Sequence, residues 1–286
     1  MSLAIPESEL IINPDGSIYH LNLKPEHLAT SILAVGDPDR VAKISGHFDQ
    51  IEYKGGKREF ITHTGYYRGK RISVISTGMG TDNIEIFMTE LDALVNINLQ
   101  TRIPKQTHTT LEIVRVGTSG SMQEDIPIDS LLASTHAVGL DTLMTFYSLD
   151  HTSFEVKLLE RVKNDLDLPF TPYCVSGSSQ LLTKLGKGLM KGVTVTCPGF
   201  FAPQGRRVRI EPAFPGIIQT LGNIQVDGNR LSNFEMETAG YYAMGRLLGH
   251  EVLSLNAIIG NRISQTFSEN PDLVVENLIL HTLNNF

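Results

Sequence analysis

The feature that most constrains the fold is the alternation of short runs rich in Val and Ile with longer segments whose apolar residues recur at helical spacing. The junctions carry Gly, Ser or Asp, which favour turns and helix caps. This alternation is typical of an α/β domain. The expected strands are residues 31–36, 71–77, 111–117, 130–135, 192–196 and 252–259, and the expected helices are 80–96, 153–166, 234–248 and 272–283.

Composition narrows the class of function. The chain has 286 residues, 41% of them hydrophobic, which is enough for a sizeable core. A formal net charge of −7 argues against a general nucleic-acid binder, although a small anion could still sit in a locally basic pocket. The first twenty residues show no signal-peptide pattern and no stretch approaches a membrane span, so we expect a cytoplasmic protein. Cys174 and Cys197 are expected to be small core residues.

Residues 233–239 read NFEMETA and place Glu235 and Glu237 on either side of Met236, at the expected start of a helix. The local explanation is capping, with Asn233 as the cap and the acids complementing the positive end of the helix dipole. The alternative is that these acids serve polar groups elsewhere in the chain.

Three arginines also need an explanation. Arg115 interrupts the apolar run LEIVRVG before a Gly-Thr-Ser-Gly turn, so it either meets a buried partner or faces water on an edge strand. In GDPDR, Asp37 can cap a helix, and Arg40 then lies at either an anion site or a simple strand-to-helix turn. Arg58 precedes Glu59 in a Gly-rich hairpin, where the plain interpretation is an ordinary solvated pair.

Together these segments resemble the nucleoside phosphorylase superfamily, and within it the uridine phosphorylases. The resemblance runs from about Tyr19 to about Arg262, and the order and separation of its motifs make it specific. It implies one α/β domain over residues 1–286, with a central mixed twisted sheet flanked by helices. The motifs are YHLNL, VGDPDRV, KREF, STGMG, RVGTSGS, QGR, FEMET and NR.

The resemblance implies a phosphate site shared between subunits. Inorganic phosphate, the co-substrate, would attack C1′ of the nucleoside through an oxocarbenium-like transition state, releasing the base and leaving ribose 1-phosphate. Gly36, Arg40, Arg115 and Thr118 of one subunit would hold it, with Arg58 reaching over from the neighbour and Arg115 taking part in catalysis. We therefore expect self-association, as a dimer or a trimer of dimers, and no organic cofactor.

The resemblance also implies a ribose site at the FEMET motif. Met236 would pack against the sugar ring and Glu237 would accept hydrogen bonds from the 2′ and 3′ hydroxyls, with Glu235 in the same shell. A carboxylate only accepts hydrogen bonds, so it can take both donors of a cis-diol. His20, in IYHLNL, matches a residue that contacts the 5′ hydroxyl from the neighbouring subunit.

The stretch CPGFFAPQGRRVR matches the base site of the pyrimidine branch, with Gln204 and Arg206 at the matching places as catalytic residues. Their hydrogen-bonding groups suit the edge of uracil. Arg262 resembles a second base-side arginine, and Phe200 or Phe201 would stack on the base unless they lie in the core. The alternatives are a solvated basic loop or a nucleic-acid patch.

Other activities of the same superfamily would require different residues. Purine phosphorylases and nucleosidases carry an Asp after the late strand, whereas the corresponding stretch AIIGNR (257–262) has no acid. A nucleosidase that uses water would have little need for Arg40, Arg58 and Arg115 together. A nucleoside-binding protein without turnover is a further alternative. Thymidine and 2′-deoxyuridine are open as additional substrates.

The chain departs from the family pattern at several points. Gly260 stands where a larger apolar residue is usual, which predicts a roomier base pocket. A monovalent cation such as potassium would use Glu59 and Met79, but Asn83 stands where Ser is usual. The polar segment 96–110 is expected to be a surface excursion, and 263–272 either a lid over the site or an ordinary loop.

Overall fold

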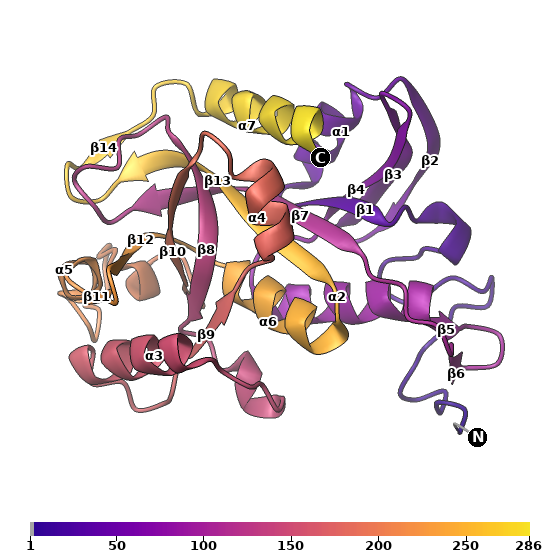
Figure 1. The fold of residues 1–286 in the computed structure, drawn as a ribbon, viewed down its shortest axis with the longest axis horizontal. Coiled ribbons are helices and arrows are strands. Elements are labelled where there is room, and N and C mark those ends of the chain that lie inside the picture. Colours follow the sequence, from indigo (N-terminus) through magenta and orange to yellow (C-terminus); the bar gives the residue numbers. More distant parts are fainter. Residues whose placement is uncertain (1–2) are drawn as a thin grey trace. The chain divides into compact units, whose positions relative to one another are not determined.

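The computed structural model describes residues 3–286 (Figure 1). These residues divide into two compact units. The first contains the chain up to Val114 together with Met244–Glu251, and the second contains Arg115–Ala243 and Val252–Phe286. The predicted α/β class, with mixed sheets and flanking helices, is confirmed. The expectation of a single domain over residues 1–286 stays a prediction.

The first unit contains a mixed sheet with the strand order β1-β4-β3-β2. Strand β1 runs parallel to β4, and β3 is antiparallel to both β4 and β2. Helix α1 packs against β1, β3 and β4. The strands are β1 (Ser31–Val35), β2 (Gln50–Lys57), β3 (Phe60–Tyr67) and β4 (Lys70–Ser76), and the helices are η1 (Pro25–His27), α1 (Pro38–Ser45) and α2 (Thr81–Asn96).

The turn after β1 forms as its sequence predicts. The side chain of Asp37 accepts a hydrogen bond from the backbone nitrogen of Asp39 at 3.0 Å and so caps α1, while Pro38 takes the first helical position. Gly36 lies close to the backbone of the loop after β4, because a Cβ there would come within 3.3 Å of the carbonyl oxygen of Gly78. The turn therefore brings the N-terminus of α1 to the carboxyl end of β1.

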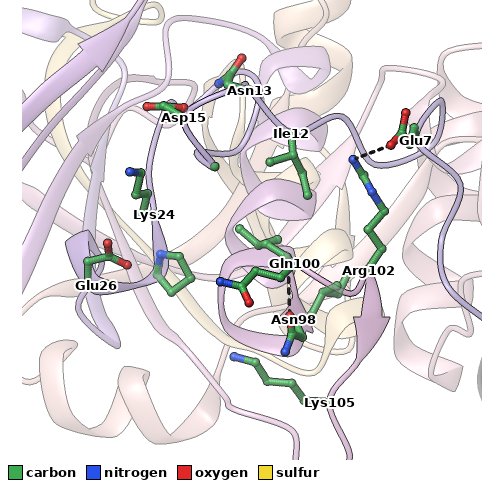
Figure 2. Close-up of a pocket in the computed structure, with 14 residues that line it drawn as sticks. Glu7, Ile12, Asn13, Asp15, Lys24, Glu26, Asn98, Gln100, Arg102 and Lys105 are labelled. Atoms are coloured by element: carbon green, nitrogen blue, oxygen red, sulfur yellow. Dashed lines mark hydrogen bonds and ion pairs between the residues drawn. The ribbon is translucent and has the colours of Figure 1, made fainter.

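The polar segment 96–110 is a largely exposed excursion, as expected. Its two short strands, β5 (Ile97–Asn98) and β6 (Ile103–Pro104), form an antiparallel pair. The segment borders an open hollow of about 790 Å³ in the first unit (Figure 2). Acids such as Glu7 and bases such as Arg102 line it, and Nη2 of Arg102 lies 3.8 Å from Oε1 of Glu7. None of the predicted site residues lines this hollow.

The second unit also contains a mixed sheet, in the order β11-β12-β10-β8-β13-β7, with β9 paired to β8 and β14 paired to β13. The strands are β7 (Glu112–Ser121), β8 (Leu131–Gly139), β9 (Tyr173–Ser176), β10 (Met190–Thr196), β11 (Gln225–Val226), β12 (Asn229–Glu235), β13 (Glu251–Asn261) and β14 (Thr266–Phe267). The helices are η2 (Leu143–Phe146), α3 (Ser153–Asp165), α4 (Ser179–Leu185), η3 (Ala202–Gln204), α5 (Ile217–Gly222), α6 (Thr238–Leu248) and α7 (Pro271–Asn285).

The core of this unit explains the two cysteines. Cys174 and Cys197 are buried free thiols in an apolar cluster that includes Val138, Leu158 and Val195. The prediction that they are small core residues is therefore confirmed. Burial raises the pKa of the Cys197 thiol well above its ordinary value, which keeps it protonated and chemically inert.

The expected strands and helices all form, but the helix predicted from residue 234 begins at Thr238. Residues up to Glu235 belong to β12, which pairs with β10 and β7. The prediction that Asn233 caps this helix is therefore wrong. Asn233 is fully buried in the strand, where it donates to Ser119 Oγ and accepts from Thr194 Oγ1, both at 2.9 Å.

Among residues 3–286, no helix combines the length and the apolar character that crossing a membrane requires.

Candidate active site

Arg115 is buried in strand β7 with only 6% of its surface exposed. Its Nη2 lies 2.7 Å from Oε2 of Glu237 and 3.0 Å from Oε2 of Glu235, while Nη1 donates to Oδ1 of Asn256 at 3.1 Å. Burial alone would lower the pKa of the guanidinium, but the charges of the two carboxylates outweigh burial and raise it. The edge-strand alternative for Arg115 is wrong, and the expectation of a buried partner is confirmed.

A glycine allows this arrangement. The guanidinium of Arg115 folds back over Gly117, where an added Cβ would lie 2.0 Å from Nη1 of Arg115. Any side chain at Gly117 would therefore displace the guanidinium from the two carboxylates.

Glu235 caps the helix in place of Asn233. Its carboxylate accepts hydrogen bonds from the backbone nitrogens of Glu237 and Thr238 at 2.9 Å, and from Oγ1 of Thr196 at 2.7 Å. The same carboxylate pairs with Arg115. Glu235 thus fixes both the start of α6 and the guanidinium of Arg115. It caps the helix and also serves a polar group that is distant in sequence, so both interpretations of this acid hold.

The predicted base-site residues of the second unit lie in one cluster. Gln204 is buried at the end of η3, and its Oε1 accepts a hydrogen bond from Nη1 of Arg206 at 2.6 Å. The guanidinium of Arg206 lies 3.7 Å above the ring of Phe200. Arg262 donates to the backbone oxygens of Gln204, at 2.9 Å, and Gly205, at 3.2 Å. Gly205 ends η3 with a φ of +66°, a left-handed conformation that glycine adopts without strain.

Two cations in this cluster are partly removed from water. Burial lowers the pKa of Arg206 and of Arg262, and the charge of Arg262 lowers that of Arg206 further. An anion that entered here would relieve both costs. The cluster is therefore suited to stabilising negative charge on a bound group.

Phe200 and Phe201 are not core residues. Their side chains are 50% and 58% exposed and contact each other edge to face at 5.4 Å. The core alternative is therefore wrong for both, and Phe200 offers one face to Arg206.

In the first unit, His20 is held by Glu90 of α2. The ring nitrogen Nδ1 lies 2.7 Å from Oε1 of Glu90, and the same carboxylate accepts from the backbone nitrogens of His20 and Leu21. Because Nδ1 donates to the carboxylate, Nε2 carries the lone pair and can accept a hydrogen bond. Sequence reasoning missed Glu90, although an acid between the buried Phe87 and Leu94 of an apolar helix face was a usable signal.

The two units divide the predicted residues between them. Arg58 is exposed at the turn between β2 and β3, in the hairpin that the sequence predicts, with a φ of +57°. The first unit holds His20, Gly36, Arg40 and Arg58, and the second holds Arg115, Thr118, Phe200, Gln204, Arg206, Met236, Glu237 and Arg262.

The comparison with known families decides the class of protein. The model of the phosphorylase superfamily matches residues 30–279. The chain belongs to the phosphorylase superfamily. As an α/β member of this family it matches the fold class expected from the sequence.

The similar proteins are named as phosphorylases of either pyrimidine or purine nucleosides. The chain is 30% identical over 259 residues to uridine phosphorylase of Thermococcus kodakarensis, covering 89% of this chain and 81% of that one. It is 27% identical over 241 residues to a DeoD-type purine nucleoside phosphorylase of Streptococcus suis, covering 84% of each. The crystal structure of a Trypanosoma brucei nucleoside phosphorylase, described as showing uridine phosphorylase activity, matches with a TM-score of 0.87 and 28% identity, covering 97% of this chain and 100% of that one.

The candidate cation ligands of this phosphorylase lie in its first unit. Glu59 and Asn83 both approach Gly78, because a Cβ at Gly78 would lie 3.1 Å from Cγ of Glu59 and 2.7 Å from Nδ2 of Asn83. Met79 follows directly and would offer its backbone carbonyl. Carboxylate, carbonyl and amide oxygens are hard donors that fit such a cation, so the residues suit it, and its binding stays a prediction.

The structure shows the surroundings of Gly260 and of the segment 263–272. A Cβ at Gly260 would lie 3.5 Å from Cδ2 of Phe267, so the space beside this glycine is bordered by the ring that β14 supplies. Residues 262–265 form the turn that connects β13 to β14. Residues 263–267 of segment 263–272 therefore belong to this hairpin, and the action of the segment as a lid stays a prediction.

Proposed function

We propose that this phosphorylase catalyses the reversible phosphorolysis of uridine to uracil and ribose 1-phosphate. The observation that carries the proposal is the cluster of Gln204, Arg206 and Arg262 beside the exposed ring of Phe200. A glutamine amide can donate to one position and accept from another along the N3–H and O2 edge of uracil, and its oxygen has a second lone pair beyond the one that Arg206 uses. The similarity to the two proteins with uridine phosphorylase in their descriptions supports the same substrate class.

The charge of the cluster fits the leaving group. As the glycosidic bond breaks, negative charge spreads over the oxygens of the departing pyrimidine. Arg206 and Arg262 are already partly desolvated, so they stabilise this charge with little reorganisation. Uracil thus departs without a proton donor of the kind that a purine requires.

For phosphate and ribose we keep the residues that the family resemblance implies. Arg115, Thr118, Gly36 and Arg40 would hold phosphate, with Arg58 contributed by a neighbouring subunit. Glu237 is oriented by its 2.7 Å contact with Arg115, which supports a role in accepting hydrogen bonds from the ribose hydroxyls. Met236 and His20 would contact the ring and the 5′ hydroxyl. Thymidine and 2′-deoxyuridine are further candidate substrates, and we place the reaction in the cytoplasm.

A purine nucleoside is the second candidate, because DeoD-type purine nucleoside phosphorylases match almost as much of the chain. The residues at the end of β13 argue against it. The stretch 257–262 offers no carboxylate to a purine N7, and its Arg262 is bonded to the backbone of the base loop instead. A protein that binds nucleosides without turnover has no feature of its own in its favour.

Phosphorolysis of uridine, thymidine and inosine, measured side by side with inorganic phosphate, tests the proposal. We expect uracil release and ribose 1-phosphate formation from uridine to exceed base release from inosine. Faster turnover of inosine would make the enzyme a purine phosphorylase. Base release from uridine that does not depend on phosphate would make it a nucleosidase, and tight binding without any base release would make it a binding protein.

A mixing experiment tests whether subunits share the site. Arg58→Ala and Gln204→Ala homo-oligomers should each have low activity, because every site lacks one contact. If Arg58 acts on the neighbouring subunit, a hybrid dimer has one site with both lesions and one with neither. Random pairing makes about half the dimers hybrids, so roughly a quarter of all sites should regain full activity.

The control for mixing is mass analysis of the co-refolded or co-expressed sample. Hybrids that form without activity above the parents would show that Arg58 acts within its own chain or not at all.

A further inference from the structure

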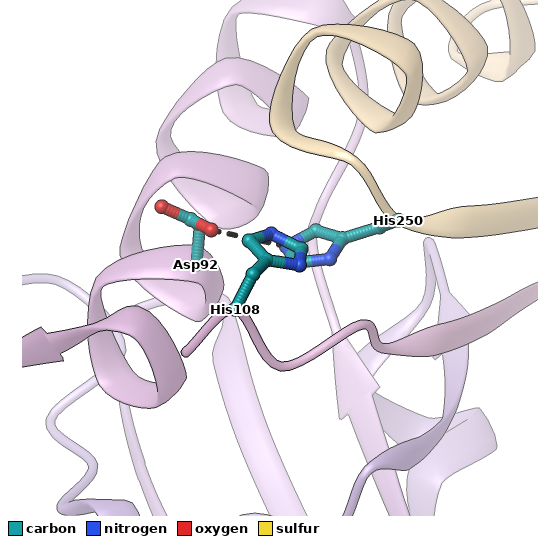
Figure 3. Close-up of side chains that lie close together, drawn as sticks. All are labelled: Asp92, His108 and His250. Carbon is teal, nitrogen blue, oxygen red and sulfur yellow. Dashed lines mark ion pairs between the residues drawn. The ribbon is translucent and has the colours of Figure 1, made fainter. Parts of the chain in front are cut away.

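Three potential metal ligands, none of them assigned a role above, come together in the first unit (Figure 3). Asp92 lies on α2, His108 on the surface excursion 96–110, and His250 on the connection between α6 and β13. One ligand atom of each lies within 4.8 Å of those of the other two. The three side chains thus meet at a point that the chain order does not predict.

The spacing of Asp92 and His250 suits a metal better than a hydrogen bond. The His250 side chain is fully buried, and its Nε2 makes no hydrogen bond although it lies 3.4 Å from Oδ1 of Asp92. A charge-assisted hydrogen bond would be about 2.7–2.9 Å long. Two ligands of a tetrahedral zinc ion, each about 2.0–2.1 Å from the metal, are separated by roughly 3.3 Å. The buried nitrogen therefore already stands at ligand spacing from the carboxylate.

The neighbouring contacts orient the other two ligands. Nε2 of His108 donates to the carbonyl oxygen of Leu248 at 2.9 Å, which leaves the lone pair on Nδ1, 3.5 Å from the hydroxyl oxygen of Thr110. Asp92 Oδ1 accepts from Nδ2 of Asn96 at 2.6 Å. Metal-bound histidines and carboxylates characteristically make such outer contacts.

The donor set and the space around it also suit a transition-metal ion. Gly249, with a φ of +73°, leaves the space that the ring of His108 occupies, because a Cβ there would lie 3.2 Å from Cε1 of His108. A carboxylate with two imidazoles is a donor set that suits Zn²⁺ and its neighbours in the first transition row.

We propose that Asp92, His108 and His250 bind one divalent transition-metal ion of the Zn²⁺ class, with water completing the coordination. The ion fastens the surface excursion 96–110 to α2 and to the connection between α6 and β13. Binding has a cost at His250, whose Nδ1 accepts a 3.3 Å hydrogen bond from the backbone nitrogen of Leu111. This bond places the ring proton on Nε2, so the metal must displace that proton and disturb the bond.

Zinc binding to the 286-residue chain, first stripped with a chelator and then dialysed, tests this site. We expect one Zn²⁺ per chain by isothermal titration calorimetry, with a Kd of about 10 µM or tighter, and a rise in Tm when zinc exceeds Kd about a hundredfold. Co²⁺ should bind the same site and provide an absorbance band that reports tetrahedral geometry. These readouts do not depend on the proposed phosphorolysis.

The variants separate this site from other histidines. His108→Ala removes an exposed ligand without opening the core, and Asp92→Asn keeps the shape but removes the charge. Each should weaken zinc binding at least about tenfold and remove the Tm rise. His281→Ala, which alters a partly buried histidine of α7 in the second unit, is the control and should bind as the parent protein does.

The results decide the proposal in either direction. Stoichiometric binding that is lost in both ligand variants and kept in the control supports the site. Binding that is absent from the parent protein, weaker than millimolar, or unchanged in His108→Ala and Asp92→Asn overturns it.

Discussion

Replacing Arg115 with alanine is expected to lower kcat/KM for uridine phosphorolysis by about 10³-fold or more, because a preorganised donor to the reacting anion is lost. Arsenolysis should fall in parallel, since arsenate would have to occupy the same place. The variant also leaves Glu235 and Glu237 buried without their cation, which should destabilise the fold by about 3–5 kcal/mol. Steady-state kinetics and urea denaturation measure the two effects separately.

Gly117→Ala tests whether the position of the Arg115 guanidinium matters in addition to its charge. An added Cβ would lie 2.0 Å from Nη1 of Arg115, so the charge is kept but must move, and we expect a loss of activity with a smaller loss of stability. Gly216→Ala is the matched control, because a Cβ there meets nothing within 4 Å. Full activity in a folded Arg115→Ala variant would show that this arginine serves the structure alone.

Gln204→Ala is expected to lower kcat/KM for uridine by about 10²-fold or more. The base would lose a hydrogen-bonding partner in a buried site, where water does not replace it. The structure adds a second cause, since Oε1 of Gln204 also holds Arg206 at 2.6 Å. Arg262 should stay in place, because it is bonded to backbone oxygens. The KM for phosphate should change little. A changed phosphate requirement with intact uridine kinetics would mean that this loop belongs to the phosphate site.

Gln204→Glu distinguishes the two causes. A carboxylate can still accept from Arg206 but cannot donate to the base and adds a negative charge beside it, so activity that stays as low as in Gln204→Ala would show that holding Arg206 is not sufficient. Recovery of activity would show that the main role of Gln204 is to hold Arg206. Gln219→Ala, an exposed glutamine of α5, is the control and should leave uridine kinetics unchanged.

The sequence by itself determined the local structure wherever short-range chemistry decides it. Continuous apolar runs predicted strands such as β1 because these are buried on both faces, and helical spacing of apolar residues predicted the helices because each buries one face. Asp37 and Pro38 predicted the start of α1 because a cap and a first-turn proline act within one turn of the chain. Arg115 was predicted to need a buried partner because burial of an unpaired guanidinium is too costly. The motif order around these residues also predicted the family that the comparison then confirmed.

Only the tertiary structure decided which side chains contact one another. Asn233 looked like a helix cap, but pairing of β12 with β10 extends the strand through Glu235, which then caps the helix and meets Arg115. Hydrogen bonds between strands outweighed a local capping preference, because they satisfy several backbone groups at once. His250 and His108 lie far apart in sequence, and no periodicity links either to Asp92. Only the packing of the connection before β13 and of the surface excursion against α2 brings these three side chains together.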